Sequence, residues 1–382
     1  MDKRILIDAT TVNITQPGGG SFCVQAYIEA LLRIYPNQVD VMHPKEAHIR
    51  DERYRTIDVP RRKRLDILRG GWQGYFHRGG KYVVDYILKN PNIYHTIFLN
   101  TGLFAGKIIE QLHNQSIRFV VLHHNFEPEY RIASRSILTL RGKTDKLVRY
   151  WEKKGYQNAT INLFLTESDC HLFENEYSSH AHNYVTGVFE PTEEKQVYNP
   201  SQPTPTAVIT CSLEDIQNHA SIMHFIEQYM PLFVQVMPDW QVRLMGRNPS
   251  QQLIQTVTST AQMAIYPNPV DIRSLAAESS IYLCPMEDGG GLKLRIMDGL
   301  RAGQPILVHE RSSRGYETMM NMPFFKTYKD ASSFAEQLHL LRDYIDAPTY
   351  SRQGVQASYY NLFGLEKGIE RLKSILSNTI EC

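Results

Sequence analysis

The chain alternates between two kinds of segment, and this alternation limits the fold more than any other feature of the sequence. Short runs of aliphatic and β-branched residues, at 4–9, 118–122 and 161–165, have the length and composition of buried strands. Stretches with apolar side chains at helical spacing, such as residues 21–35, lie between them. Strands that alternate with helices predict an α/β fold, in which parallel sheets are covered by helices.

The same alternation accounts for most of the remaining chain. The predicted strands are residues 93–99, 207–211, 241–245, 263–266, 281–285 and 305–309, and the predicted helices are residues 104–113, 146–156, 220–233, 270–277, 292–302 and segments from about residue 331 onward. These segments form two series, one in each half of the chain. We therefore expect two doubly wound domains in tandem.

A polar, proline-rich segment separates the two series at residues 191–206, and its composition cannot build a core. The 382 residues also exceed the ~250–300 at which single cores stop growing. We predict an N-terminal domain at residues 1–190, a linker at 191–206 and a second domain at 207–360. Residues 361–382 are expected to form a helix that packs back toward the first domain.

Charge balance and cysteine spacing exclude several classes of protein. The 41 basic and 40 acidic residues give a net charge of +1, without the basic excess that is typical of nucleic-acid-binding proteins. Five scattered cysteines lack the close pairs of a zinc site or a disulfide framework: Cys23, Cys170, Cys211, Cys284 and Cys382. No signal peptide is recognised, and no run approaches the ~20 apolar residues of a membrane span. We expect a cytoplasmic protein that binds neither nucleic acid nor metal.

Polar residues and glycines cluster directly after the predicted strands of the first domain, where open parallel sheets bind ligands. They are Asp8 with residues 18–20 (Gly-Gly-Gly), residues 100–102 (Asn-Thr-Gly), 123–125 (His-His-Asn) and 166–168 (Thr-Glu-Ser). The glycine run would let the backbone approach a phosphate or sugar, with Ser21 capping the next helix. An ordinary flexible loop before a capped helix fits the same residues.

Two adjacent histidines, His123 and His124, end a strand whose residues 119–122 are all apolar. Such a run is typical of a strand buried on both faces. Successive side chains of a strand point to opposite faces, so the two histidines are expected to face different surroundings. One of them is expected to be structural.

The strongest candidate site in the second domain is residues 289–293, Gly-Gly-Gly-Leu-Lys, after the strand at 281–285. Glycines at a helix start expose backbone N–H donors, and Lys293 in the first helical turn adds a full positive charge. This combination predicts a diphosphate-binding loop. Asp298, five residues further on, would accept hydrogen bonds from vicinal hydroxyls such as those of a ribose. A glycine-rich connection with a solvated lysine is the plainer interpretation of the same segment.

The order of these motifs resembles that of family 4 glycosyltransferases, of the group-1 type with the GT-B fold. The matching pieces are residues 212–218 after a strand, the helix ending at Pro231, residues 238–246, residues 270–272, the block from Gly289 through Asp298 to Pro305, and residues 315–317. In the first domain, residues 18–20 and His-Asn-Phe-Glu at 124–127 resemble further family segments. The resemblance spans most of the chain and depends on the ordered combination of motifs.

This resemblance implies two Rossmann-like domains that face a central cleft. The implied activity is hexosyl transfer from a nucleotide-diphosphate sugar, such as a UDP- or GDP-sugar, to an acceptor hydroxyl. The family transfers with retention of configuration and without a metal or other cofactor, and the implied role is the synthesis of bacterial cell-surface polysaccharides or glycans. The leaving phosphate itself accepts the acceptor's proton, so no general base is required.

The implied site residues follow from the same motifs. Lys293 and the amides of Gly289, Gly290 and Gly291 would hold the diphosphate, beside Leu292. Asp298 takes the place of the second glutamate of the family's E-x-x-x-x-x-x-x-E motif, which binds the donor ribose. His124 would lie near the donor sugar as a catalytic residue with Lys293, and Gly19, Gly20, Ser212 and Asn218 complete the expected donor-binding set.

The sequence departs from the family pattern at two places. An arginine–lysine pair that many members carry after the first strand of the second domain is absent, and Ser212, Glu214 and Asn218 occupy that region instead. Asp298 is one methylene shorter than the family's glutamate. We therefore expect the diphosphate contacts to depend more heavily on Lys293.

Two other functions remain open at this stage. A sugar-nucleotide epimerase or hydrolase of the same architecture would need a pair of acid–base carboxylates, for which Glu127 and Glu167 are the candidates. The missing basic pair is also consistent with a non-catalytic GT-B partner subunit.

A basic stretch interleaved with aromatic residues lies in the first domain. It comprises Arg50, Arg53, Arg55, residues 61–64 (Arg-Arg-Lys-Arg), Arg69, Arg78 and Lys81, with Trp72, Tyr75 and Phe76. Such a stretch fits peripheral contact with the anionic inner face of the plasma membrane, where a lipid-linked acceptor would be found. A solvated charged face fits equally well.

Overall fold

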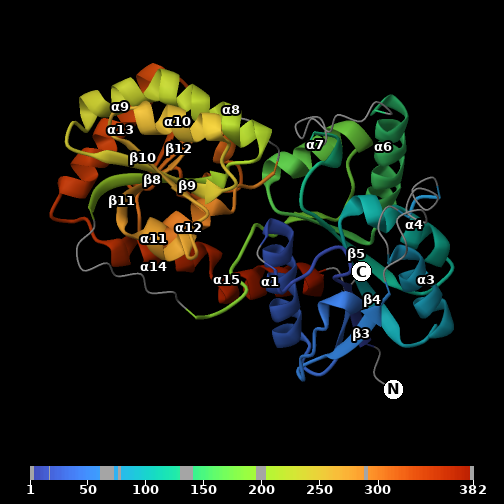
Figure 1. Ribbon diagram of the computed structural model, residues 1–382. Helices are drawn as coiled ribbons and strands as arrows, with labels where there is room; N and C mark the ends of the chain where they lie inside the picture. Colours follow the sequence, from blue (N-terminus) through green and yellow to red (C-terminus); the bar gives the residue numbers. More distant parts are fainter. Residues whose placement is uncertain are drawn as a thin grey trace. The chain divides into compact units, whose positions relative to one another are not determined.

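The computed structural model describes residues 4–16, 18–60, 73–75, 79–129, 141–194, 204–287 and 291–378. The chain forms two compact units (Figure 1). Unit 1 contains Met1–Glu193 together with Phe363–Cys382, and unit 2 contains Glu194–Leu362. Of the predicted linker, residues 195–203 lie outside the described residues.

Unit 1 is built on a parallel sheet with the strand order β3-β2-β1-β4-β5-β6-β7. The strands are β1 (Arg4–Asp8), β2 (Val39–Pro44), β3 (Arg55–Val59), β4 (Tyr94–Asn100), β5 (Arg118–His123), β6 (Ile161–Phe164) and β7 (Asn183–Val185). The order reverses at β1, so the loops after β1 and β4 diverge at the carboxyl edge of the sheet. This edge is where the fold offers a ligand site.

Helices cover both faces of this sheet. They are α1 (Gly19–Ile34), α3 (Gly80–Lys89), α4 (Gly102–Leu112), α6 (Arg141–Asn158), α7 (Glu167–Tyr177) and α15 (Leu365–Asn378), with a short 3-10 helix η1 (Lys45–Ala47). One hydrophobic core joins α1 and α15 to the sheet, and a second joins α3 and α4 to the opposite face. The C-terminal helix α15 therefore belongs to the core of unit 1, where Leu372 and Leu376 are buried beside strand β1.

Helices α4 and α6 approach each other unusually closely because glycines face the contact. A Cβ atom on Gly155 of α6 would lie 2.5 Å from the carbonyl oxygen of Gly102, and one on Gly106 of α4 would collide with the carbonyl oxygen of Trp151. Gly102 itself packs against the ring of His123. Because these positions carry no side chains, α6 can pack closely against α4, near the carboxyl ends of β4 and β5.

Unit 2 has a second parallel sheet, in the order β10-β9-β8-β11-β12-β13. Its strands are β8 (Thr204–Ser212), β9 (Gln241–Arg247), β10 (Met263–Pro267), β11 (Ser279–Cys284), β12 (Ile306–His309) and β13 (Phe325–Tyr328). Its helices are α8 (Ile216–His224), the π-helix η2 (Phe225–Tyr229), α9 (Met230–Val236), α10 (Gln251–Ser259), α11 (Ile272–Ala277), α12 (Arg295–Arg301), the 3-10 helices η3 (Glu310–Ser312) and η4 (Glu317–Met319), α13 (Ala331–Asp346) and α14 (Arg352–Phe363). Here the strand order reverses between β8 and β11.

The predicted α/β class with two doubly wound sheets is confirmed, but two local predictions are wrong. Ser21 does not cap the first helix, because α1 already begins at Gly19 with Gly18 at its N-cap, and the Ser21 hydroxyl donates instead to the carbonyl oxygen of Asn13 at 2.9 Å. Lys293 does not lie in the first turn of a helix that starts at Leu292, because α12 begins only at Arg295. Lys293 therefore belongs to the loop that leads into α12.

Candidate functional site

Two cations stand at the point of unit 2 where the strand order reverses. Arg295, the first residue of α12, reaches back to the end of β8, where its Nη1 donates to the carbonyl oxygen of Thr210 at 3.0 Å. Lys293 lies two residues earlier, and its own carbonyl oxygen accepts a 3.0 Å hydrogen bond from the hydroxyl of the fully buried Tyr316. Tyr316 thus fixes the backbone from which the Lys293 side chain extends.

The groups that act most strongly on Arg295 are thiols and a phenol, with a smaller effect from Asp215. Burial favours a lower pKa for Arg295, but the neighbouring Cys211, Cys284 and Tyr282 raise it overall. Burial in turn raises the pKa of Cys211 to about 11 and that of Tyr282 well above its ordinary value, so both groups are uncharged near neutral pH. Among the described residues, no carboxylate lies within 4.0 Å of the Arg295 guanidinium. Its charge therefore lacks a contact ion pair within the described chain.

Lys293 shares this positive environment. Burial is the main cause that lowers the pKa of Lys293, and the nearby guanidiniums of Arg295 and Arg314 lower it further. Asp215, in the loop after β8, raises the pKa of both Lys293 and Arg295. Such a group of desolvated cations favours an anion as its partner.

Ser212 and Asn218, both predicted to bind the donor, lie on either side of the loop between β8 and α8, at the end of β8 and in the first turn of α8. The Asn218 amide donates to the carbonyl oxygen of Ser212 at 3.0 Å. Asp215 caps α8 by accepting from the backbone N–H groups of Gln217 at 2.9 Å and Asn218 at 3.3 Å. The region where the family's basic pair is missing is therefore a polar loop, and its Asp215 lies within electrostatic reach of Lys293.

Asp298 is held by two arginines on a single oxygen. Its Oδ1 lies 2.6 Å from Nη1 of Arg301 and 3.1 Å from Nε of Arg273, which belongs to α11. The carboxylate is about a quarter exposed, with 27% of the side chain accessible. Asp298 therefore ties α11 to α12 through Oδ1. Gly291, which precedes the loop residues Leu292 and Lys293, adopts a left-handed φ of 75°; Gly289 and Gly290 lie outside the described residues.

In unit 1 the two histidines face different neighbours, as the alternation of side chains in a strand predicts. His123 bonds through Nε2 to the Asn162 amide oxygen at 2.8 Å and stacks on Phe164, with ring centroids 4.8 Å apart. His124 bonds through Nε2 to the amide oxygen of Asn100. Burial lowers the pKa of His123 to about 3 and that of His124 to about 4, so both are neutral at physiological pH. His123 is the structural member of the pair.

The predicted residues thus fall into two groups. Ser212, Asn218, Leu292, Lys293 and Asp298 belong to unit 2, and Gly19, Gly20 and His124 belong to unit 1. Gly19 and Gly20 form the first turn of α1 rather than a loop, and a Cβ on Gly20 would lie 3.2 Å from the side chain of Val12. Both acid–base candidates, Glu127 and Glu167, also belong to unit 1, where Glu167 is the first residue of α7.

The sequence analysis missed two functional candidates. Arg295 is a cation at the start of a helix, where the helix dipole disfavours positive charge, and this conflict was the available signal. Glu152 is a fully buried carboxyl group of α6 whose Oε1 accepts from the backbone N–H of Glu127 at 3.1 Å and whose Oε2 accepts from the Tyr177 hydroxyl at 2.8 Å. Burial raises the pKa of Glu152 to about 8. Its role depends on tertiary contacts that the sequence pattern does not contain.

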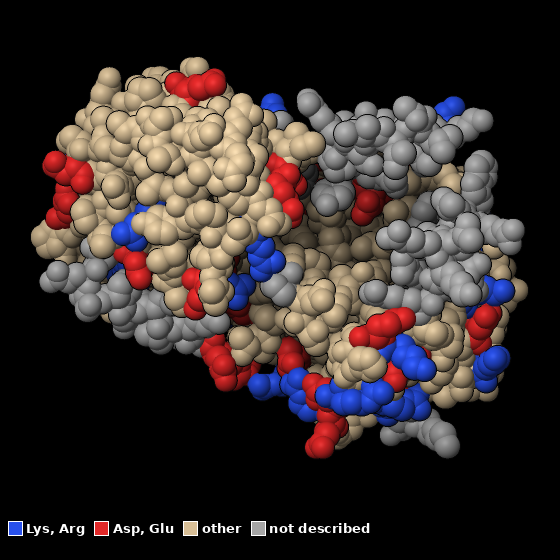
Figure 2. Space-filling model, in the orientation of Figure 1, with Lys and Arg blue, Asp and Glu red and all other residues tan. Residues whose placement is uncertain are grey.

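Three arginines of the basic stretch in the first domain form ion pairs with carboxylates. Arg50 pairs with Asp58 at 2.7 Å, Arg53 pairs with Glu29 and Asp51, and Arg55 pairs with the buried Asp40. Figure 2 accordingly shows basic and acidic side chains intermixed on this part of the surface. Residues 61–64, Arg69, Trp72, Phe76 and Arg78 lie outside the described residues. These ion pairs favour a solvated charged face over a basic patch around Arg50–Arg55. No described helix combines the length and apolar character needed to cross a membrane.

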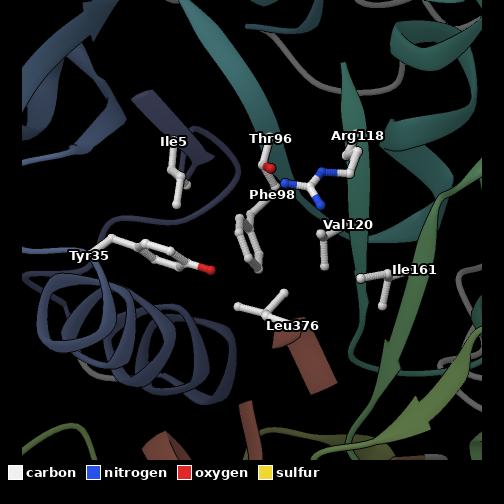
Figure 3. Close-up of a pocket in the computed structure, with 8 residues that line it drawn as sticks. All are labelled: Ile5, Tyr35, Thr96, Phe98, Arg118, Val120, Ile161 and Leu376. Carbon is white, nitrogen blue, oxygen red and sulfur yellow. The ribbon is translucent and has the colours of Figure 1, made fainter. Parts of the chain in front are cut away.

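A small cavity in unit 1 lies at the opposite edge of the sheet from His124. It is lined by side chains from the amino ends of the strands, including Ile5, Arg118 and Ile161, and is closed by Tyr35 and Leu376 (Figure 3). Its volume of about 10 Å³ has room for a single water molecule. This cavity is therefore too small for a substrate.

Solved structures with the same fold are glycosyltransferases. Sucrose-phosphate synthase from Thermosynechococcus elongatus superimposes with a TM-score of 0.71 over 99% of both chains, at 14% sequence identity. Anabaena HepE in complex with UDP gives a TM-score of 0.66 at 12% identity, covering 98% of this chain and all of that one. The lipopolysaccharide outer core galactosyltransferase WaaB gives 0.65 at 9% identity, covering 98% of this chain and 99% of that one.

The chain has a GT-B fold. At these identities the likeness establishes the arrangement of strands and helices and leaves the activity to the site residues. No protein-family model matches the chain, and no curated protein shows significant sequence similarity to it. Lys293 and Arg295 lie at the strand-reversal point of unit 2.

Proposed function

We propose that the protein is a glycosyltransferase that moves a hexosyl group from a nucleotide-diphosphate sugar to an acceptor hydroxyl, an activity of the EC 2.4 type. The observation that carries this proposal is the Lys293–Arg295 pair at the carboxyl edge of unit 2. Arg295 is desolvated and has no carboxylate within 4.0 Å among the described residues, and a bound anion stabilises such a cation. A nucleoside diphosphate supplies such an anion, and HepE, which shares the fold, has been solved with UDP and with UDP-glucose.

In this proposal the two cations stabilise the leaving group. The bond between the anomeric carbon and the phosphate oxygen breaks, and negative charge builds up on the diphosphate in an oxocarbenium-like transition state. Lys293 and Arg295 lie where that charge develops, and Tyr316 keeps Lys293 in position. The acceptor oxygen forms the new bond to the anomeric carbon, and its proton passes to the released phosphate, so transfer proceeds with retention and without a metal.

The remaining predicted residues complete the donor site. The amides of residues 289–291 and Leu292 bind phosphate oxygens, and Ser212 and Asn218 line the loop after β8. Asp298 binds the donor ribose through Oδ2, since Oδ1 is engaged by Arg273 and Arg301. Within unit 1, the residues proposed to recognise the sugar are His124 and, at the start of α1, Gly19 and Gly20.

The proposed setting is polysaccharide or glycan assembly in a bacterial cytoplasm, with a glycan or lipid-linked acceptor at the inner face of the plasma membrane. WaaB, with the same fold, is named for transfer to the lipopolysaccharide outer core. The donor is a UDP- or GDP-sugar.

The test is incubation of the protein with UDP- and GDP-sugars, with and without saccharide acceptors, followed by mass spectrometry of products. Transfer to an acceptor that disappears in Lys293→Met but persists in Lys329→Met, a substitution on the exposed side of unit 2, is the expected result. Epimerisation of the donor, or its stoichiometric hydrolysis whatever the acceptor, would instead identify the isomerase or hydrolase. Absence of both reaction and nucleotide binding would indicate a non-catalytic subunit.

A further inference from the structure

Glu287, in the loop that follows β11, is bound by two side chains of helix α8. Its backbone N–H donates to Oγ of the buried Ser221 at 3.3 Å. Its carboxylate oxygen Oε1 lies 2.6 Å from Nδ1 of His224. An ionised carboxylate only accepts hydrogen bonds, so Nδ1 of His224 carries the proton. One face of α8 therefore holds both the backbone and the side chain of Glu287.

A π-helix brings a third side chain of this face to Glu287. Ser221 and His224 lie three residues apart, so they share one face of α8. The next segment, η2, is a π-helix, whose backbone hydrogen bonds span five residues instead of four. Tyr229, five residues after His224, therefore lies beside it, with ring centroids 5.5 Å apart. Burial and then the Glu287 carboxylate raise the pKa of Tyr229 to about 12. π-helices are rare and occur frequently at functional sites.

The carbonyl oxygens of the same segment are bound from η3. Nη1 of Arg311 donates to the carbonyl oxygen of Glu287 at 3.4 Å. The hydroxyl of the buried Ser312 donates to the carbonyl oxygen of Met286 at 2.5 Å. The chain is thus fixed at residues 286–287 by elements on both sides of it.

These contacts fix the beginning of the loop that ends at Lys293, and the Tyr316 hydroxyl fixes its end by donating to the Lys293 carbonyl oxygen. A loop that is held at both ends loses less conformational freedom when it binds a ligand than one that is held at a single end. The side chains of His224 and Glu287 are 42% and 27% exposed. A pair this exposed adds little to global stability, so its effect is expected to be local.

We propose that His224 and Glu287 are positioning residues for the donor-binding loop of unit 2. The hydrogen bond between them holds the backbone at Glu287, and this keeps Lys293 in the geometry that receives a diphosphate. Neither side chain contacts the ligand in this account. The inference rests on the proposed function for the identity of that ligand.

Substitutions at the two positions remove the hydrogen bond or restore it. Leucine at either position removes it. In His224→Asn an amide N–H takes the place of the Nδ1 donor, and in Glu287→Gln an amide oxygen still accepts. His171→Leu is the matched control, because His171 pairs with Glu174 in α7 of unit 1 with Nδ1 and the carboxylate oxygen 3.4 Å apart.

The first measurement is hydrogen exchange at the backbone N–H of Glu287 in the absence of nucleotide, read by fragmentation mass spectrometry. Exchange in His224→Leu should be about tenfold faster than in wild type, because the local anchor opens more often. His224→Asn and His171→Leu should exchange like wild type. Unchanged exchange in His224→Leu overturns the proposal, whether or not the protein binds a nucleotide.

The second measurement is calorimetric titration of UDP. Affinity in His224→Leu and in Glu287→Leu should fall about tenfold, the cost of ordering roughly one residue of backbone on binding. The double variant should lose no more than either single variant, because the two residues act through one hydrogen bond. His224→Asn and Glu287→Gln should recover most of the affinity, and His171→Leu should match wild type.

Three other results are informative. A lower melting temperature of His224→Leu with unchanged UDP affinity shows a merely structural role and overturns the proposal. A loss of affinity in Glu287→Leu that His224→Leu does not share shows that Glu287 contacts the ligand itself, which also overturns it. A wild-type protein that binds neither UDP nor GDP contradicts the proposed function, and the exchange of the Glu287 N–H then still decides whether His224 anchors the loop.

Discussion

The two sheets have the same strand order over six strands, but the side chains at their carboxyl edges differ in charge. In unit 1 the strand order reverses between β1 and β4, where the neutral Asn100, Thr101 and His124 follow or end β4 and β5 and the carboxylate of Asp8 ends β1. In unit 2 it reverses between β8 and β11, where the cations Lys293 and Arg295 are found. The fold therefore determines where a ligand binds, and a few side chains determine which ligand it is.

Burial explains how this difference arises. Desolvation removes the charge of a histidine by lowering its pKa, as it does for His124. It cannot remove the charge of an arginine, which stays protonated in proteins. A buried histidine therefore offers neutral hydrogen-bonding groups, whereas a buried Arg295 retains its positive charge.

The largest expected effect concerns Glu152 of unit 1, a second buried group that burial holds in its uncharged form. Its pKa of about 8, raised chiefly by burial with a smaller contribution from Glu127, means that folding holds the carboxyl group protonated, while the unfolded chain ionises near 4.5. Tyr177, the backbone of Glu127 and Arg149 lower the pKa only in part. Stability from this group is complete below pH 4.5 and is lost as the pH rises to about 8, by up to ~4 kcal/mol.

Glu152→Gln should therefore flatten the pH dependence of urea unfolding between pH 5 and about 8 and be relatively most stable at the upper end. Glu370→Gln, on the exposed side of α15, serves as the control and should follow wild type. A variant whose unfolding free energy falls with pH as steeply as that of wild type would show that Glu152 is ionised in the folded protein.

The second prediction is a variant that lowers the stability of unit 1 and leaves the cations of unit 2 unchanged. Gly155→Ala would raise helix propensity by about 1 kcal/mol, but its methyl group would lie 2.5 Å from the Gly102 carbonyl oxygen. We expect the collision to prevail and to cost about 2–3 kcal/mol. Gly18→Ala, whose Cβ has its nearest neighbour at 3.9 Å, is the control. Urea unfolding should show the loss, and UDP binding in the absence of urea should persist; a stabilised Gly155→Ala would refute the close helix contact.

The smallest effect concerns the proton on Lys293. Burial and two guanidiniums lower its pKa, and a bound diphosphate should raise it again. UDP binding should therefore take up a fraction of a proton at alkaline pH, and affinity should weaken a fewfold as the pH rises toward 9. Calorimetry in buffers of different ionisation enthalpy measures the uptake, which should vanish in Lys293→Met. Proton release on binding would contradict the assignment.

The sequence predicted the elements that follow simple periodicity and missed those that depend on pairing. The buried strands β1, β5 and β11 are continuous apolar runs, so their pattern is sufficient. Strands β2 and β3 carry Asp40 and Arg55, and the buried Asp40 is compatible with a strand because it pairs with Arg55 and with Arg4 on the neighbouring strands. Such pairing is invisible before the strands are adjacent in space.

The same limit applies to the site. Lys293 stood out beside a glycine run, whereas Arg295 resembled an ordinary helical residue until its contact with Thr210 placed it at the end of β8. The contacts of Glu287 likewise have no signature in the residues themselves, since they depend on the packing of α8 and of the π-helix that follows His224. Sequence motifs thus indicated candidate loops, and the structure was needed to describe the contacts of the side chains within them.

The central claim is that Arg295 and Lys293 balance the charge of a nucleoside diphosphate, and calorimetric titration of UDP into wild type, Arg295→Met and the control Lys329→Met tests it most directly. Without nucleotide, Arg295→Met should be at least as stable as wild type, because an apolar side chain replaces a desolvated cation that has no contact ion pair with any described residue. Its affinity for UDP should fall about 100-fold or more, a loss of ~2.7 kcal/mol, with Lys329→Met unchanged. Wild-type affinity for UDP in a folded Arg295→Met would contradict the account.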